Sequence, residues 1–164
     1  MNHFYIQTSI IQAYFKDLNS NDLLFEPLHR EYYNFMRWFK NKSTEQCYIT
    51  RDSYKNLTSF FYMKEEFKTE DYRDLTPVFL KRNRLKIGTL LVQNHGNSFG
   101  NIYMDLALSH AYRKDFDEVY ITFYNYEHNK DVLSSFLTHK WGFNYYGKKG
   151  EELVYLRSLR PLLV

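Results

Sequence analysis

A strand, a turn, a helix and a second strand follow one another between residues 85 and 124, and this order constrains the fold most. Residues 85–92 form an apolar run of strand length, and residues 101–113 carry apolar side chains at helical spacing. Residues 119–124 alternate in the way of a strand and are rich in β-branched and aromatic side chains. A helix between two strands makes a right-handed crossover with parallel strands. The chain is therefore predicted to be an α/β protein.

Further elements are expected on both sides of this unit. Pro27 suits the first turn of a helix that should run to about Lys42. The remaining expected elements are strands at 47–50 and 57–64, a polar connection at 68–84, a helix that Gly142 ends, and a hairpin of strands 143–146 and 153–156 around Gly147–Gly150. Together they predict a mixed, mostly antiparallel sheet with helices on both faces and one parallel strand pair.

Aromatic residues make up 20% of the 164 residues, which is an unusual share. Such rings serve either as packing or as a surface on which nucleic-acid bases stack. Most of them fall on apolar stripes or on strands expected to be buried: Phe35, Phe39, Phe60, Phe61, Tyr103, Phe123, Phe136, Trp141 and Phe143. This placement favours a core within one domain, residues 1–164, that has an N-terminal part at 1–56 and a central part at 57–157. Tyr120, Tyr124 and Tyr145 stay open to a functional role.

Composition excludes several classes of protein. The aromatic content and the net charge of +3 exclude a disordered chain, and no apolar run approaches the ~20 residues that a bilayer requires. The single cysteine, Cys47, can form neither an internal disulfide nor a cysteine-based zinc site, and it is predicted to be buried and inert. His128 and His139 lack a third ligand nearby, so no metal is expected. A reduced, cytoplasmic location is the simplest expectation.

The positive charge is concentrated in one run, Lys81, Arg82, Arg84 and Lys86. The run is either a solvated loop before a strand or a set of phosphate contacts. An RNA-binding protein is therefore kept as an alternative.

The segment 91–101, Leu-Val-Gln-Asn-His-Gly-Asn-Ser-Phe-Gly-Asn, joins the apolar strand to the start of the helix. Small residues there allow backbone N–H groups to face outward, and the helix dipole adds partial positive charge at the same place. These properties predict an anion site that suits a pyrophosphate.

The turn resembles the signature of the GNAT superfamily of acyl-CoA-dependent N-acetyltransferases, Gln/Arg-x-x-Gly-x-Gly/Ala. The six positions fall on His95 to Gly100; Gly100 matches, whereas His95 and Ser98 depart from the pattern. A second family pattern, Asn-x-x-Ala-x-x-Leu-Tyr followed by Gly-Phe, matches at Leu137, Gly142 and Phe143 and departs at Asp131, Ser134 and Thr138.

The resemblance implies that acetyl-CoA binds where the parallel strands 85–92 and 119–124 splay apart. The pantetheine arm would pair with backbone near Leu91 and Val92, and the pyrophosphate would rest on amides of the turn. The implied cofactor-binding residues are Leu91, Val92, His95, Gly96, Asn97, Ser98, Phe99, Gly100 and Asn101.

The resemblance also implies direct transfer of the acetyl group to an amine, which needs a base and an acid. Glu65 and Glu66, at the end of an apolar strand, are candidate bases, although charged residues that end a strand are usually only solvated. The family's acid is a tyrosine where this chain has Thr138. Tyr124 or Tyr145 could replace it, the thiolate could leave without an acid, or the protein could bind CoA without catalysis.

These observations predict an acetyl-CoA-dependent N-acetyltransferase with an unknown amine acceptor. A non-catalytic CoA- or ligand-binding module and an RNA-binding protein are the alternatives. Nucleic acid is not the favoured partner, no membrane partner is expected, and a homodimer is left open.

Overall fold

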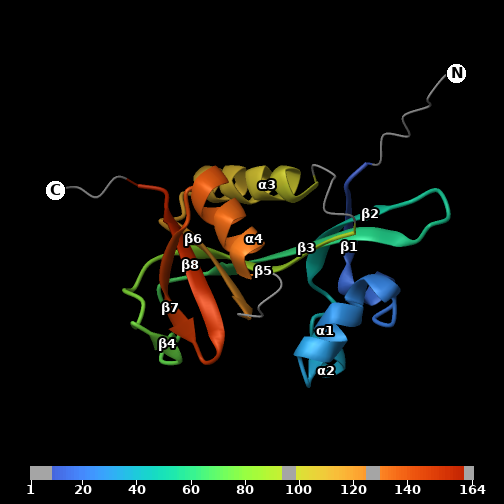
Figure 1. Ribbon diagram of the computed structural model, residues 1–164, viewed down its shortest axis with the longest axis horizontal. Coiled ribbons are helices and arrows are strands. Elements are labelled where there is room, and N and C mark those ends of the chain that lie inside the picture. The colour runs from blue at the N-terminus through green and yellow to red at the C-terminus, as the bar shows by residue number, and fades with distance from the viewer. Residues whose placement is uncertain (1–8, 94–98, 125–129, 161–164) are drawn as a thin grey trace, which may run out of the picture. The chain divides into compact units, whose positions relative to one another are not determined.

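The computed structural model describes residues 9–93, 99–124 and 130–160 (Figure 1). Its elements are β1 (Ile11–Tyr14), η1 (Phe15–Asp17), η2 (Leu23–Phe25), α1 (Glu26–Glu31), α2 (Phe35–Asn41), β2 (Gln46–Arg51), β3 (Leu57–Glu66), β4 (Leu75–Thr76), β5 (Arg84–Val92), α3 (Phe99–Arg113), β6 (Glu118–Tyr124), α4 (Lys130–Ser135), η3 (Phe136–Lys140), β7 (Asn144–Lys149) and β8 (Glu152–Ser158).

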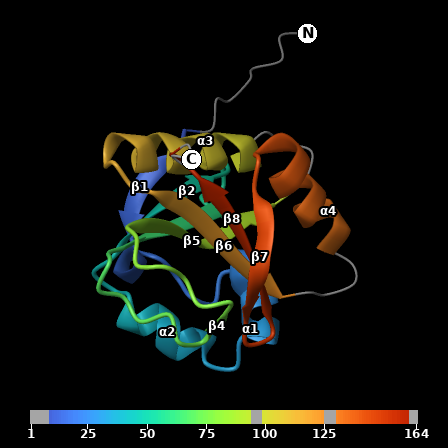
Figure 2. The same cartoon turned by 90° about the vertical axis from the view of Figure 1, so that its left-hand side faces the viewer.

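The strands form an eight-stranded sheet in the order β1-β2-β3-β5-β6-β8-β7-β4. β5 and β6 are parallel, with a register that runs from Arg84 opposite Glu118 to Ile87 opposite Ile121. The pairs β1–β2, β2–β3, β6–β8, β7–β8 and β4–β7 are antiparallel. Figure 2 shows β6, β8 and β7 side by side in this arrangement. The mixed, mostly antiparallel sheet and the parallel crossover are confirmed.

The described residues group into two compact units. Unit 1 is built from residues within 1–62 and 89–100, and unit 2 from residues within 63–88 and 101–164. The boundary therefore falls inside β3, after Tyr62. A single domain over 1–164 that divides at residue 56 stays a prediction.

The core of unit 1 consists mainly of aromatic rings. The Phe60 ring on β3 meets the rings of Phe15 and Phe25 edge to face, with centroids 5.4 and 5.0 Å apart. Helices α1 and α2 add Leu28, Phe35 and Phe39, all buried. Edge-to-face pairs of buried rings are favourable beyond the area that they bury. The buried phenylalanines of this unit are packing, as expected, whereas Tyr14, Tyr33 and Tyr54 are exposed.

The predicted helix from Pro27 to Lys42 is wrong in one respect, because the chain breaks it in two. Tyr32 is extended (φ −118°, ψ 109°) and separates α1 from α2. The break falls in Tyr-Tyr-Asn, three residues of low helix propensity. Within α2, Phe35 and Phe39 are buried and Met36 is 48% exposed.

In unit 2, α3 begins two residues earlier than predicted and buries a shifted stripe: Tyr103, Met104, Ala107, Leu108 and Ala111. Ile102, one of the apolar residues at helical spacing, is 43% exposed. The following helix changes at Phe136 from α4 into η3, a π-helical turn, and Gly142 (φ 71°) ends it as predicted.

Gly147 lies inside β7, and the hairpin turns at Gly150 (φ 58°), so the predicted turn was placed too early. Gly147 is needed for close approach, because a Cβ there would lie 2.1 Å from the carbonyl oxygen of Thr76. That neighbour belongs to β4, which lies in the segment predicted as a plain connection. The short strands β1 and β4 were not predicted.

Candidate functional site

The proposed cofactor segment begins at the end of β5. Leu91 and Val92 are half-buried there, and Leu91 packs against the core of unit 1. The Gln93 N–H donates to the Thr58 carbonyl oxygen at 2.9 Å. His95, Gly96, Asn97 and Ser98 lie outside the described residues, so their predicted role stays a prediction.

α3 begins at Phe99, and its first turn contains Gly100 and Asn101. The N-terminal turn of a helix carries partial positive charge, which favours an anion nearby. The Asn101 Oδ1 accepts a hydrogen bond of 3.1 Å from the indole Nε1 of Trp141. The fold therefore uses the Asn101 side chain to hold the start of α3 to the residue that follows η3.

Glu65 lies on the face of the sheet that α3 covers. Its Oε1 is 2.9 Å from the Nε2 of His110, whose N–H donates, and 4.0 Å from the Nζ of Lys114. The Glu65 side chain is 35% exposed. The apolar stripe of this helix suggested a hydrogen-bonded core histidine at His110; the hydrogen bond is present, but the side chain is 23% exposed and lies at the edge of the core.

Glu66 points to the opposite face, since neighbouring residues of a strand alternate. It is buried, and its Oε1 accepts hydrogen bonds from the hydroxyls of Tyr120 and Tyr72, the latter at 3.2 Å. The Lys64 Nζ lies 3.3 Å from the other carboxylate oxygen. Burial and then the negative charge of Glu66 raise the pKa of both phenols, so both keep their protons and donate.

Lys86 joins this cluster from β5. It stands opposite Tyr120 in the parallel register, and its Nζ is 5.9 Å from the centre of the Tyr120 ring. Burial, and secondly the charge of Lys149, lower the pKa of Lys86 to about 8, against the opposing effect of Glu66 and Glu152. Part of the Lys86 population is therefore a neutral amine at mildly alkaline pH. The sequence included Lys86 only as a member of the basic run.

Two residues of the basic run form ion pairs within the fold. Arg84 is 1% exposed, and its Nε lies 2.6 Å from Glu118 Oε2. Arg82 Nη1 lies 2.5 Å from the other oxygen of Glu118. The Arg84 guanidinium also lies 4.1 Å from the centre of the Phe79 ring. Two of the four cations thus pair with one buried acid, which weakens the interpretation of the run as phosphate contacts.

The two tyrosine candidates lie on opposite faces of the sheet. Tyr145 pairs with Tyr155, which pairs with Ile121, whereas Tyr124 pairs with Glu152. Ile121 and Tyr124 are an odd number of residues apart on β6, so they face opposite ways. Tyr145 therefore shares the face of Glu65, and Tyr124 shares that of Glu66, Tyr120 and Lys86.

Tyr155 was not chosen from the sequence. It is 8% exposed, its ring lies 5.8 Å from that of Tyr145, and its hydroxyl lies 3.0 Å from the Ser134 hydroxyl. Tyr155 lies beside Tyr145 because the two residues are opposite each other in the register of β7 and β8, which the sequence does not show. Thr138, at the position of the family's tyrosine, is exposed.

Cys47 is fully buried, and burial, with a smaller effect of Asp17, raises the pKa of its thiol to about 12. The predicted burial of Cys47 is therefore confirmed, and the lack of reactivity stays a prediction that the raised pKa supports. Among the described side chains, no three potential metal ligands come together. Within residues 9–93, 99–124 and 130–160, no helix has the length and hydrophobicity to cross a membrane.

Comparison with solved structures identifies the fold. A protein assigned to the GNAT family from Desulfovibrio desulfuricans superposes with a TM-score of 0.60 at 7% identity, covering 93% of this chain and 100% of that one. NAA60 of Arabidopsis thaliana, solved with acetyl-CoA, gives 0.59 at 14% identity over 92% and 100%. The NatC complex bound to Gag peptide and CoA gives 0.52 at 14% over 93% and 99%.

No protein-family model matches the sequence, and no curated protein matches it. The chain has the fold of the GNAT superfamily of acetyltransferases, as the resemblance of its motifs predicted.

Proposed function

We propose that this protein is an acetyl-CoA-dependent N-acetyltransferase that moves the acetyl group directly to an amine. The observation that carries the proposal is the parallel β5–α3–β6 crossover, in a fold that NAA60 uses with acetyl-CoA bound. The partial match of the turn before α3 to the family signature supports it. The acceptor amine is not assigned, and a cytoplasmic location and a homodimer stay predictions.

For the cofactor, we place the pantetheine arm along the backbone of Leu91 and Val92. The pyrophosphate would contact amides of the turn from His95 to Asn101. A strand end followed by the N-terminal turn of α3 suits this, because the first amides of a helix have no acceptor within it and the dipole attracts negative charge.

For the chemistry, the sheet divides the candidates into two sets, Glu65 with Tyr145 and Glu66 with Tyr124. We favour the face of Glu66, because it collects buried ionisable groups whose pKa values are shifted, as active sites commonly do. There Lys86, when neutral, would accept the proton of the acceptor amine. Glu66 would hold Tyr120 and balance the charge on Lys86, and Tyr124 would protonate the CoA thiolate.

A non-catalytic CoA-binding module remains the alternative, and the exposed Thr138 at the position of the family's tyrosine favours it. Calorimetry with acetyl-CoA and CoA tests binding, and thiol release with a panel of amines tests transfer. No heat of binding at millimolar ligand contradicts both functions. Binding with sustained turnover excludes the non-catalytic alternative.

One variant tests the place of the pyrophosphate. Gly100→Asp puts a carboxylate in the first turn of α3, where it favours the helix and repels a phosphate. We expect CoA binding at least about fivefold weaker, because one like charge within contact distance costs on the order of 1 kcal/mol or more. Gly100→Ala is the matched control and should retain binding. Equal binding by both variants would contradict the placement.

A further inference from the structure

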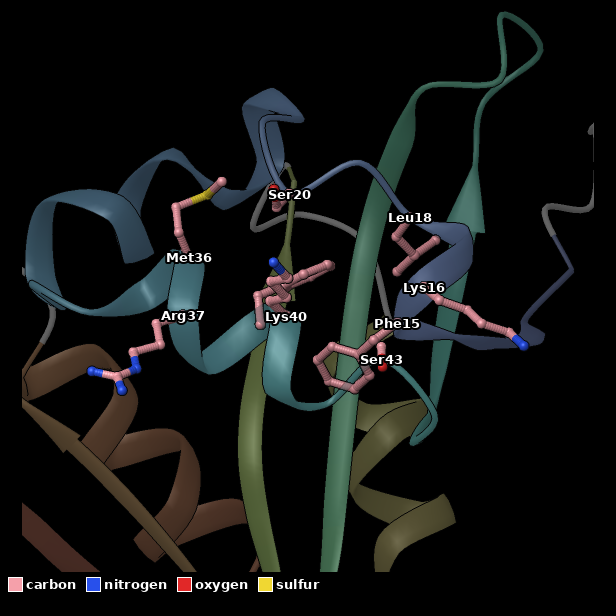
Figure 3. A pocket seen from close by; sticks show the side chains of 9 residues that line it. Phe15, Lys16, Leu18, Ser20, Met36, Arg37, Lys40 and Ser43 are labelled. Carbon is pink, nitrogen blue, oxygen red and sulfur yellow. The ribbon is translucent and has the colours of Figure 1, made fainter.

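Unit 1 contains an open pocket of about 450 Å³ that the proposed acetyl transfer does not use (Figure 3). It is lined by residues of η1, α2 and the segments beside them: Phe15, Lys16, Leu18, Ser20, Met36, Arg37, Phe39, Lys40 and Ser43. This volume is within the ~300–1,000 Å³ range of ligand-binding clefts.

The pocket has an apolar floor. Phe15, Leu18 and Phe39 belong to the buried core of unit 1 and are only 0%, 9% and 6% exposed, so they form the base of the pocket but offer little accessible surface. Met36, from α2, stands beside them and is 48% exposed. An apolar side chain placed here would bury surface of its own together with that of Met36.

Three cations accompany this floor, and no acid lines the pocket. Lys16, Arg37 and Lys40 are exposed, and within the part of the chain that the structure describes no ion pair is recorded for them. In Figure 3, Lys16 and Arg37 extend to opposite sides, and Lys40 lies between them. The positive charge is thus spread along the pocket rather than gathered at one point.

We propose that this pocket docks an acidic peptide segment of a partner protein, with one or two apolar side chains in the pocket and carboxylates on both flanks. A single anionic group could reach only one end of the row of cations, whereas an extended peptide spans it.

The test measures fluorescence anisotropy of a labelled peptide in which a Leu-Phe pair is flanked by runs of Asp and Glu. One control peptide carries Lys in place of the acids, and another carries Gly-Ser in place of Leu-Phe. We expect saturable binding of the first peptide only, weakening as salt rises. Amide NMR shifts should concentrate in η1 and α2.

The protein variants separate a specific site from general attraction. Lys16→Gln, Arg37→Gln and Lys40→Gln combined should weaken binding about tenfold, since each exposed charge pair contributes a few-fold at most. The matched triple, Arg113→Gln, Lys140→Gln and Lys148→Gln, removes the same charge from exposed positions in unit 2 and should change binding less than about twofold.

Met36→Gln should weaken binding several-fold, because it removes apolar contact area. The inference is overturned if the two triple variants lose affinity equally. It is also overturned if the Gly-Ser peptide binds as well as the Leu-Phe peptide, or if a uridine oligonucleotide binds this site and the acidic peptide does not.

Discussion

The two units differ in what they bury. Unit 1 buries aromatic and aliphatic side chains, and its fully buried polar groups, Thr50 and Ser59, are hydroxyls. The buried charged residues of the described chain, Glu66, Arg84 and Glu118, all lie in unit 2. Buried charge is costly to hold and is retained only with partners, so it indicates where a protein does chemistry or fixes a unique geometry. This difference supports our proposal that the acid–base chemistry takes place in unit 2.

The largest expected effect comes from separating the buried ion pair. Glu118→Gln leaves Arg84 charged and buried, which should lower the free energy of unfolding by about 3–5 kcal/mol. Chemical denaturation measures it. Glu26→Gln removes an exposed pair with Arg30 in unit 1 and should cost less than about 0.5 kcal/mol. The double variant Arg84→Met with Glu118→Leu should recover most of the loss. If Glu118→Gln lowered the free energy of unfolding as little as Glu26→Gln, buried charge in unit 2 would not differ energetically from exposed charge in unit 1.

Lys86→Met should reduce kcat/KM about 100-fold, a usual contribution of a general base. In the unmodified protein kcat/KM should rise with an apparent pKa of about 8, the pKa to which burial and Lys149 lower Lys86. Lys81→Met, at an exposed position of the same basic run, is the control and should leave the rate unchanged. Loss of activity in Glu65→Gln and Tyr145→Phe, with Lys86→Met active, would instead place transfer on the face of α3.

Lys86 should also make stability depend on pH. Its pKa is lower in the folded chain than in the unfolded chain, so between pH 8 and about 10.5 the unfolded state binds more protons and stability rises with pH. Between pH 7.5 and 9 the free energy of unfolding of the unmodified protein should increase by about 1 kcal/mol more than that of Lys86→Met. Cys47 contributes a pH dependence of opposite sign, because its raised pKa makes the folded state lose stability above pH 9. This contribution is the same in Lys86→Met, so the difference between the two proteins does not contain it. Parallel pH profiles of the two proteins would contradict this.

Loss of a buried hydroxyl in unit 1 is expected to cost far less than loss of the buried acid in unit 2. The Thr50 Oγ1 lies 2.5 Å from the Ser59 Oγ and 2.8 Å from the Thr58 Oγ1. Thr50→Val keeps the shape and removes one hydroxyl, so it should cost about 1 kcal/mol. The loss should not vary between pH 6 and 8, because no charged group is involved. If Thr50→Val lowered the free energy of unfolding as much as Glu118→Gln does, the buried polar groups of the two units would contribute equally to stability.

The sequence by itself determined features that depend on neighbours along the chain. The apolar run of β5, the helical spacing of α3 and the alternation of β6 are each set within a few residues, and their order fixes a parallel crossover. The aromatic core of unit 1 and the burial of Cys47 follow from the same local pattern. The break at Tyr32 was missed because apolar residues continue at helical spacing across it, and the low helix propensity of Tyr-Tyr-Asn is only a weak signal.

Tertiary structure alone decided which partners the buried acids have. Glu118 is 34 residues from Arg84, and Glu66 is 54 residues from Tyr120, and no local spacing connects either pair. Their contacts depend on strand order and on register, in which a shift of one residue turns every side chain to the other face. For that reason Glu65 and Glu66 were equivalent candidates in the sequence, whereas the folded sheet binds one to His110 and the other to two tyrosines.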